Sequence, residues 1–152
     1  GVWRVRLTLG AHGDIEIGIS AMPDLPNEAS TAVFALAETP VKRDSIWLYH
    51  KTTRRTFYEQ ALAAHPEAFD VLLCNEDGQF TEFTRGNLVL EIDGVRYTPP
   101  QSCGLLDGTL RRELLESGHL TERTLSRDDL KNASRIFFVN GLRGEIELHR
   151  YT

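Results

Sequence analysis

Residues 69–100 most constrain the fold, because they form a series of strand-like runs separated by short turn signals. The apolar run FDVLLCN is followed by the turn-like EDG and then by QFTEFT, in which apolar and polar residues alternate. NLVLEI and VRYTPP come next and are joined by Asp93-Gly94, a dipeptide typical of two-residue β-hairpin turns. Consecutive runs of this kind predict a fold that is rich in β-sheet.

Further strand-like runs lie on both sides of this region. VWRVRLT and DIEIGIS alternate around AHG, which predicts an antiparallel hairpin, and the polar, proline-rich MPDLPNEAS reads as the loop that follows. TAVFALAE suits an inner strand, IWLY is a short strand-like run, and RIFFVN and EIELHRY are joined by a GLRG turn. The strands therefore extend along the whole chain.

Three segments have helical patterns. From Thr53 the apolar spacing becomes helical, with residues 57, 61, 62 and 65 on one face and Pro66 closing the segment. DGTLRRELLES predicts a helix that begins near Gly108 and ends at Gly118, and SRDDLKNAS predicts a short helix with Ser126 as N-cap. Many strands with a few short helices predict an α+β fold, with a barrel-like or strongly curved sheet.

The chain has 152 residues, 41% hydrophobic and 26% charged, which suits one domain spanning residues 1–152. Its net charge of -5 argues against nucleic-acid binding, and no apolar stretch approaches the length of a membrane span. Cys74 and Cys103 lie far apart without CxxC spacing, which favours reduced thiols in a cytoplasmic protein. No histidine clusters with Cys, Asp or Glu at ligand spacing, so no metal site is expected.

Lys51 follows the run at 46–49 and precedes the helical pattern, so we expect it at the carboxyl end of a strand. Most lysines are solvated, and spacing alone leaves that interpretation open. The functional alternative is a lysine desolvated enough to lose its proton and bond to an aldehyde cofactor.

Glu82 lies within FTEFT, where alternation places it on one strand face with Phe80 and Thr84. A carboxylate in a sheet usually faces solvent or an ion-pair partner. A buried Glu82 would need a cationic partner instead, and the protonated nitrogen of a pyridine ring would serve.

Two stretches could bind a phosphate through backbone amides. In DGTLRR, the amides of residues 108–110 stand at a helix N-terminus, where the dipole favours an anion. The alternative is that Thr109 or Asp107 merely caps the helix. In VNGLRG, Asn140 and Gly141 follow a buried strand and form either a simple turn or a second amide-lined loop.

Together and in this order, four stretches resemble the class IV aminotransferase family, the fold-type IV pyridoxal phosphate enzymes. They are HKTTRRTFYEQAL, DVLLCNEDGQFTEFTRGNLVLEIDGVRYTPP, GLLDGTLRRELL and RIFFVNGLRG, and the match runs from about Trp47 to Arg143. The resemblance implies the large domain of that fold, a barrel-like curved sheet with a few short helices. The small amino-terminal domain of the family is expected to be absent.

The resemblance implies that Lys51 bonds to pyridoxal 5'-phosphate and serves as acid and base, while Glu82 keeps the pyridine nitrogen protonated. Substrate carboxylates need cations, and our candidates are Arg85 and Arg143, which follow site strands. Arg6, Arg54 or Arg55 could compete for this role.

The same resemblance assigns the cofactor phosphate to the backbone of two loops. Its binding residues would be Gly108, Thr109 and Leu110, followed by Asn140 and Gly141. The turn at 108–111 departs from the family's glycine-hydrophobic-threonine-arginine order at its second and third positions. We therefore expect amide contacts rather than a hydroxyl contact.

Within the family, HKTTRR, NLVLEIDGVRYTPPQSCGLLDGTLRRELL and NGLRG look most like aminodeoxychorismate lyases, especially modules fused behind aminodeoxychorismate synthase component I. The implied reaction converts 4-amino-4-deoxychorismate into 4-aminobenzoate and pyruvate for folate biosynthesis, in a homodimer. A branched-chain or D-amino acid aminotransferase and a non-catalytic module that retains the fold remain as alternatives. Because the chain begins at Gly1 rather than Met, we expect a piece of a longer protein.

Overall fold

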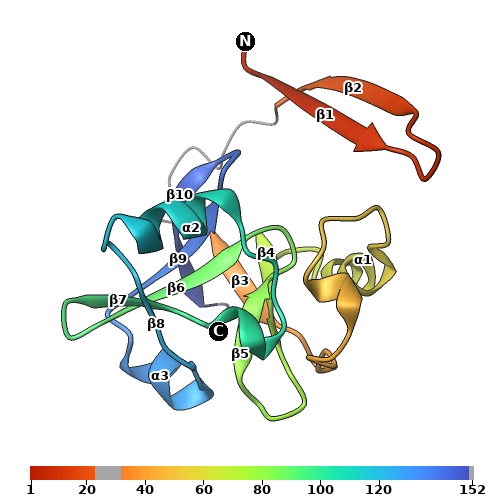
Figure 1. The fold of residues 1–152 in the computed structure, drawn as a ribbon. Helices are drawn as coiled ribbons and strands as arrows, with labels where there is room; N and C mark the ends of the chain where they lie inside the picture. The colour runs from red at the N-terminus through yellow and green to blue at the C-terminus, as the bar shows by residue number, and fades with distance from the viewer. Residues whose placement is uncertain (23–31, 151–152) are drawn as a thin grey trace.

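The computed structural model describes residues 1–22 and 32–150, so the predicted loop lies almost wholly outside the described residues (Figure 1). Its strands are β1 (Trp3–Leu9), β2 (Ile15–Ala21), β3 (Val33–Leu36), β4 (Asp70–Cys74), β5 (Phe80–Phe83), β6 (Asn87–Ile92), β7 (Val95–Thr98), β8 (Thr121–Glu122), β9 (Arg135–Asn140) and β10 (Gly144–Arg150). Its helices are α1 (Thr56–Ala63), α2 (Thr109–Glu116), α3 (Arg127–Asn132) and the 3-10 helices η2 (Ile46–Leu48) and η3 (Gln101–Cys103).

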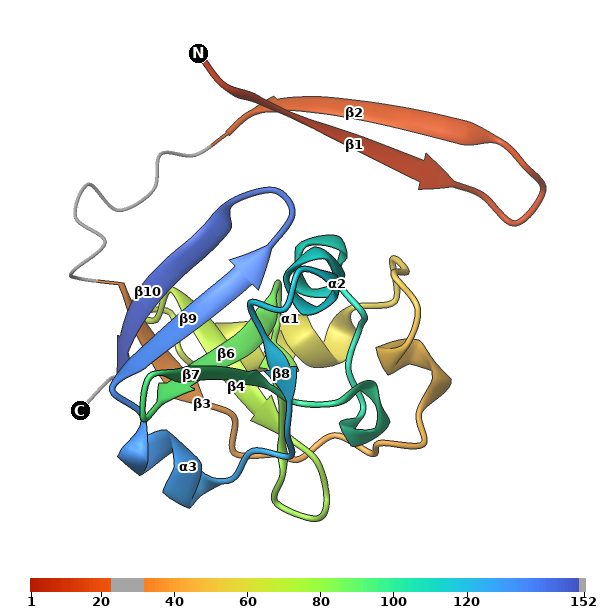
Figure 2. The ribbon, with the colours of Figure 1, turned by 60° about the vertical axis from the view of Figure 1, so that its left-hand side comes forward.

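The main sheet closes into a barrel. Its strand order is β5-β4-β3-β10-β9-β6-β7-β8, and β5 also pairs with β6. The ring therefore runs from β5 through β4, β3, β10 and β9 to β6, while β7 and β8 extend beyond it (Figure 2). The predicted α+β fold with a barrel-like sheet is confirmed.

The interior of the barrel is filled by apolar side chains from every strand of the ring. One buried cluster includes Phe34, Leu72, Phe80, Phe83, Leu88, Leu90, Phe138, Ile146 and Leu148. Simple alternation fails along β5, because Phe80 and Phe83 both join this cluster and the pairing with β4 shifts register between Leu72 and Cys74. All of β5 is buried, so Glu82 lies inside the protein.

Several local predictions are confirmed by the observed turns and helix ends. Asp93 and Gly94 both have positive φ angles, of 51° and 76°, at the turn between β6 and β7. Gly118, with φ of 74°, follows the end of α2, and Ser126 caps α3 in a reciprocal capping box with Asp129. These signals depend on local backbone chemistry, which explains why sequence alone revealed them.

The predicted strand at IWLY is wrong. Ile46–Leu48 forms the 3-10 helix η2, in which Leu48 is the one buried residue. The helix that follows begins at Thr56 rather than Thr53. β8 and η3 have no counterpart in the sequence prediction, because each is only two or three residues long.

The predicted amino-terminal hairpin is confirmed as β1 and β2, which form a separate two-stranded sheet. In both views it stands apart from the barrel (Figures 1 and 2). Cross-strand pairs join Val5 to Ile19 and Leu7 to Ile17, and all four side chains are at least 60% exposed. The hairpin therefore carries an apolar face that the described residues do not cover.

Candidate active site

Glu82 is the centre of a buried polar cluster. Its side chain is 5% exposed, Tyr58 Oη donates to Oε1 at 3.0 Å, and the Leu106 amide donates to Oε2 at 3.2 Å. Within residues 1–22 and 32–150, no cationic group lies within ion-pair distance of this carboxylate. Both of its described partners are neutral donors.

The buried environment raises the pKa of Glu82 to about 8. Loss of solvation is the main cause. The hydrogen bonds from Tyr58 and Leu106 and the charges of Arg55 and Lys51 lower the pKa, but they only partly offset the effect of burial. A cationic ligand at this position would stabilise the ionised form, so Glu82 has the character expected of a partner for a protonated ring nitrogen.

Lys51 lies in the loop between η2 and α1, not at the end of a strand as predicted. Its side chain is exposed rather than desolvated. Its positive charge nevertheless lies close enough to Glu82 to lower the pKa of that carboxyl. The structure thus places Lys51 within electrostatic reach of the buried cluster.

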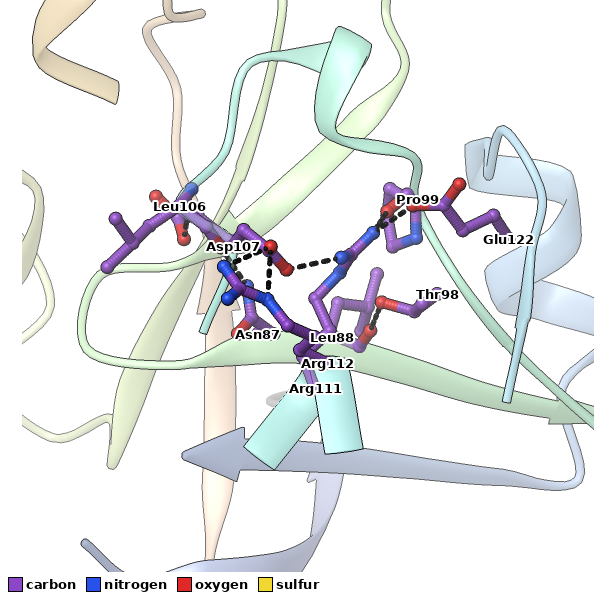
Figure 3. Close-up of polar contacts among 10 residues, drawn as sticks. Asn87, Leu88, Thr98, Pro99, Leu106, Asp107, Arg111, Arg112 and Glu122 are labelled. Atoms are coloured by element: carbon purple, nitrogen blue, oxygen red, sulfur yellow. Dashed lines mark hydrogen bonds and ion pairs between the residues drawn. The ribbon is translucent and has the colours of Figure 1, made fainter. Parts of the chain in front are cut away.

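The first turn of α2 has no side-chain cap. Gly108 occupies the N-cap position without a side-chain hydrogen bond, which contradicts the interpretation that Thr109 or Asp107 caps the helix. The Asp107 carboxylate instead binds Arg111 at 2.9 Å and Arg112 at 2.7 Å (Figure 3). Among the residues that the structure describes, no side chain accepts from the first amides of α2, which is the arrangement an anion site needs.

Arg111 anchors this turn from inside the protein. It is 2% exposed, and its guanidinium also donates to the Pro99 carbonyl at 2.8 Å and contacts Glu122 at 2.5 Å (Figure 3). Helix α2 is thereby fixed to the segment that joins β7 to η3 and to β8. An arginine with these partners has a structural role.

Asn87 holds the loop that leads into α2, and sequence reasoning missed it. Its Nδ2 donates to the Leu106 carbonyl at 2.8 Å (Figure 3). The amide of the same Leu106 donates to Glu82. A Cβ on Gly108 would overlap Asn87 Oδ1, so only glycine fits there without displacing a neighbour. The available signal in the sequence was an asparagine directly before the apolar run Leu88–Leu90.

The two predicted phosphate loops lie together. A Cβ on Gly141 would stand 2.6 Å from Thr109 Oγ1, although the two residues are far apart in sequence. The side chain of Asn140 is already engaged, since Nδ2 donates to the Arg85 carbonyl and Oδ1 accepts from the amides of Leu142 and Arg143. Asn140 thus shapes the loop, which leaves backbone amides as its means of binding a ligand.

The two arginines predicted to bind substrate have different surroundings. Arg85 Nε binds the buried Asp70 at 3.0 Å, its guanidinium contacts the Phe69 carbonyl, and it lies 5.5 Å from the centre of the Phe69 ring. Arg143 is partly buried and forms no ion pair within the described ranges. Arg143 is therefore the better candidate for binding a substrate carboxylate. Arg85 has a structural role, because its guanidinium is already bonded to Asp70 and to the Phe69 carbonyl.

The competing arginines are also partly engaged. Arg55 donates to the Thr84 carbonyl at 2.6 Å, and its guanidinium lies 4.8 Å from the centre of the Tyr58 ring. Arg54 stacks on Trp47 at 4.6 Å. Arg55 thus belongs to the cluster around Glu82, on the side of α1.

Among the described residues, no three His, Cys, Asp or Glu side chains gather into a group that could hold a metal ion. Helices long and apolar enough to span a membrane are likewise absent from the part of the chain that the structure describes.

The family model for class IV amino-transferases matches residues 2–151 of the chain. A Schizosaccharomyces pombe protein named "Putative aminodeoxychorismate lyase" is 32% identical over 147 residues, which cover 92% of this chain and 63% of that protein. An uncharacterized Haemophilus influenzae protein is 32% identical over 105 residues, covering 69% of this chain and 54% of its own length. The chain thus spans less than two thirds of each of these curated relatives.

Solved structures have the same fold. A Mesorhizobium loti structure described as a "Putative amino-acid aminotransferase" superposes with a TM-score of 0.89 at 38% identity, covering 98% of this chain and 73% of the other. The 4-amino-4-deoxychorismate lyase of Pseudomonas aeruginosa superposes with a TM-score of 0.75 at 20% identity, covering 93% of this chain and 56% of the lyase. At that identity the second likeness shows the fold alone.

Proposed function

The chain belongs to the class IV aminotransferase family of pyridoxal phosphate-dependent enzymes, and we propose that it is the cofactor-binding part of an aminodeoxychorismate lyase. The reaction would convert 4-amino-4-deoxychorismate into 4-aminobenzoate and pyruvate. The observation that carries the proposal is the connected site, in which buried Glu82 is bonded to the Leu106 amide just before the uncapped turn of α2. The choice of a lyase is supported by the similarity to the fission-yeast protein.

The residues present fit the cofactor. Amides of Thr109 and Leu110 at the start of α2, together with the loop at Gly141, suit a phosphate. Glu82 suits the pyridine nitrogen, and Lys51 is the lysine whose charge reaches Glu82. When bound, the cofactor supplies an electron sink for charge that develops on the substrate.

The contribution of the chain's own residues follows from their chemistry. Lys51, as a neutral amine, would take the proton from the substrate carbon that bears the amino group. Ionised Glu82 would hold the ring nitrogen in its protonated form, with Tyr58 and Leu106 fixing the carboxylate. Arg143 would orient a substrate carboxylate. Loss of the enolpyruvyl group makes the product ring aromatic, so these residues mainly orient groups and move protons.

Covalent labelling can identify the cofactor lysine, because the chain has three lysines to compare, Lys42, Lys51 and Lys131. The chain and the full product of the gene that encodes it, the parent protein, are incubated with pyridoxal phosphate and reduced with borohydride, and the modified lysine is mapped by mass spectrometry. We expect the label on Lys51, and its loss in Lys51→Arg but not in the controls Lys42→Arg and Lys131→Arg. Equal labelling of all three lysines, or none on Lys51 in either protein, would contradict a cofactor site.

An aminotransferase is the second candidate, favoured by the 38% identity to the Mesorhizobium loti protein. It would use the same Lys51, Glu82 and phosphate loops, so the substrate decides between the two activities. Pyruvate release from 4-amino-4-deoxychorismate supports the lyase, whereas turnover of an amino acid with 2-oxoglutarate supports the aminotransferase. A parent protein that binds no cofactor would favour the non-catalytic alternative.

We also propose that the protein forms a homodimer and is located in the cytoplasm. We propose further that it is fused to, or works with, aminodeoxychorismate synthase component I. Sedimentation analysis of the parent protein tests the homodimer, and the sequence of the parent gene tests the fusion.

A further inference from the structure

Tyr58 is a buried residue that joins helix α1 to the site strand β5. It is 8% exposed, and it is the one buried residue of α1. Its hydroxyl donates to Glu82 Oε1 at 3.0 Å across 24 positions of sequence. This bond places a neutral donor from a helix beside the only carboxylate in β5.

The two oxygens of Glu82 are held from different sides of the fold. Oε1 accepts from Tyr58 on α1, and Oε2 accepts from the Leu106 amide in the loop before α2. A carboxylate has about four lone-pair positions, so these two bonds orient it and still leave capacity for a further donor. The Glu82 carboxylate is thus held in one orientation and can still accept a further hydrogen bond.

We propose that Tyr58 is a positioning residue, whose hydroxyl fixes the orientation and the negative charge of Glu82 for a cationic N–H donor on a heteroaromatic ligand. The identity of that donor as the pyridine nitrogen of the cofactor rests on the proposed function. Tyr58 itself acts through Glu82.

The hydroxyl of Tyr58 can be removed without losing the packing contacts of its ring. Arg55 lies over the ring at 4.8 Å and Phe57 meets it edge to face at 6.1 Å, and neither contact uses the hydroxyl. Tyr58→Phe would therefore keep the ring contacts and remove one hydrogen bond. This makes the substitution a test of polarity rather than of packing.

The hydroxyl remains a donor throughout the pH range of interest. Burial, and then the neighbouring Glu82 carboxylate, raise the pKa of Tyr58 well above its ordinary value. Arg55 and Lys51 are the cations that act on Glu82, and both persist in Tyr58→Phe. The variant thus isolates the contribution of the hydroxyl to the charge of Glu82.

The first experiment uses the chain without cofactor. Carboxyl carbons of glutamate are labelled with ¹³C and titrated by NMR, and Glu82 is assigned from the signal lost in Glu82→Gln. We expect the titration midpoint of Glu82 to rise by about 1 unit in Tyr58→Phe, because a hydrogen bond to the ionised form is lost. Tyr49→Phe is the control, since Tyr49 also donates one hydrogen bond, to the Arg43 carbonyl. An unchanged midpoint in Tyr58→Phe would overturn the proposal.

The second experiment adds pyridoxal phosphate labelled with ¹⁵N in the ring, using the parent protein if the chain alone does not bind. We expect Tyr58→Phe to move the ring-nitrogen signal toward the unprotonated form and to weaken binding by about tenfold, with Tyr49→Phe like wild type. A wild-type signal and affinity in Tyr58→Phe would reduce Tyr58 to a structural residue and overturn the proposal. Failure of the wild-type proteins to bind contradicts the proposed function instead, and the titration then decides whether Tyr58 sets the charge of Glu82.

Discussion

Glu82 shows how the placement of one side chain determines its chemistry. Its carboxylate is enclosed on β5 with two neutral donors, and burial raises its pKa to about 8. Asp70, on the adjacent strand β4, is also buried, but it accepts from Val71, Thr84 and Arg85. Asp70 is therefore satisfied within the fold, whereas Glu82 gains from an added cation.

Glu82 should make the stability of the unliganded chain depend on pH. Its pKa in the folded chain, about 8, lies above the ordinary value of 4.5, so the folded state binds the extra proton between these values. The free energy of unfolding should fall as pH rises through this window, on the order of 1 kcal/mol per pH unit.

Chemical denaturation at a series of pH values measures this effect. Glu82→Gln should flatten the pH dependence between about pH 5 and about pH 8, because glutamine does not titrate. Glu59→Gln makes the same chemical change at an exposed position of α1 and serves as the control. Parallel curves for wild type and Glu82→Gln would be incompatible with a raised pKa.

Gly141 matters because it has no side chain, which allows its loop to approach Thr109 closely. Gly141→Ala would bring a Cβ to 2.6 Å from Thr109 Oγ1, so the two loops must separate or the hydroxyl must turn. We expect binding of inorganic phosphate or pyridoxal phosphate, measured by calorimetry, to weaken by about tenfold. Thr109→Ala combined with Gly141→Ala should recover affinity, since the clashing hydroxyl is gone. A double variant as weak as Gly141→Ala would show that the steric argument is wrong.

At the scale of elements, the structure was predictable where a local signal fixes the backbone. The β6–β7 turn, the end of α2 and the cap of α3 all have such signals, at Asp93-Gly94, Gly118 and Ser126. The run IWLY has no such signal, and a four-residue apolar run suits a strand or a helical turn equally well. In the structure residues 46–48 of this run form a 3-10 helix, with Leu48 buried.

The capping box formed by Ser126 and Asp129 should stabilise α3. Ser126→Ala removes the acceptor for the Asp129 amide and one partner of the Asp129 carboxylate, so it should cost about 1 kcal/mol of unfolding free energy. Urea denaturation measures the loss. Ser117→Ala, which removes an exposed hydroxyl at the carboxyl end of α2, should cost less. No measurable loss in Ser126→Ala would mean that the capping box adds nothing to stability.

At the scale of the whole molecule, the barrel and the β1–β2 hairpin differ in how they bury apolar surface. The barrel encloses its cluster between six strands, whereas the hairpin leaves Trp3, Val5, Leu7, Ile17 and Ile19 mostly exposed. Soluble proteins rarely expose a contiguous apolar face of this kind unless it contacts another surface. The two parts should therefore respond differently to truncation.

Removal of residues 1–22 should leave the cooperative unfolding of the barrel unchanged, because within the described part of the chain β1 and β2 pair with each other and with no strand of the barrel. The same truncation should reduce both self-association and fluorescence of a bound apolar dye such as ANS. Thermal unfolding followed by circular dichroism, with sedimentation velocity, measures the two effects. A clearly lower melting temperature would show that the hairpin stabilises the barrel.

The sequence by itself determined the strand-rich class and the turn and cap positions, because periodicity and backbone preferences act over a few residues. The candidates Lys51, Glu82 and the two phosphate loops came from the resemblance to the family, since spacing alone left their roles open. Only the tertiary structure decided which side chains meet. Barrel closure brought Tyr58 to Glu82, Asn87 to the loop before α2 and Gly141 to Thr109. These contacts join distant positions, and no local pattern encodes them. The burial that raises the pKa of Glu82 likewise depends on the assembled barrel, because desolvation is produced by surrounding atoms rather than by neighbours in the sequence.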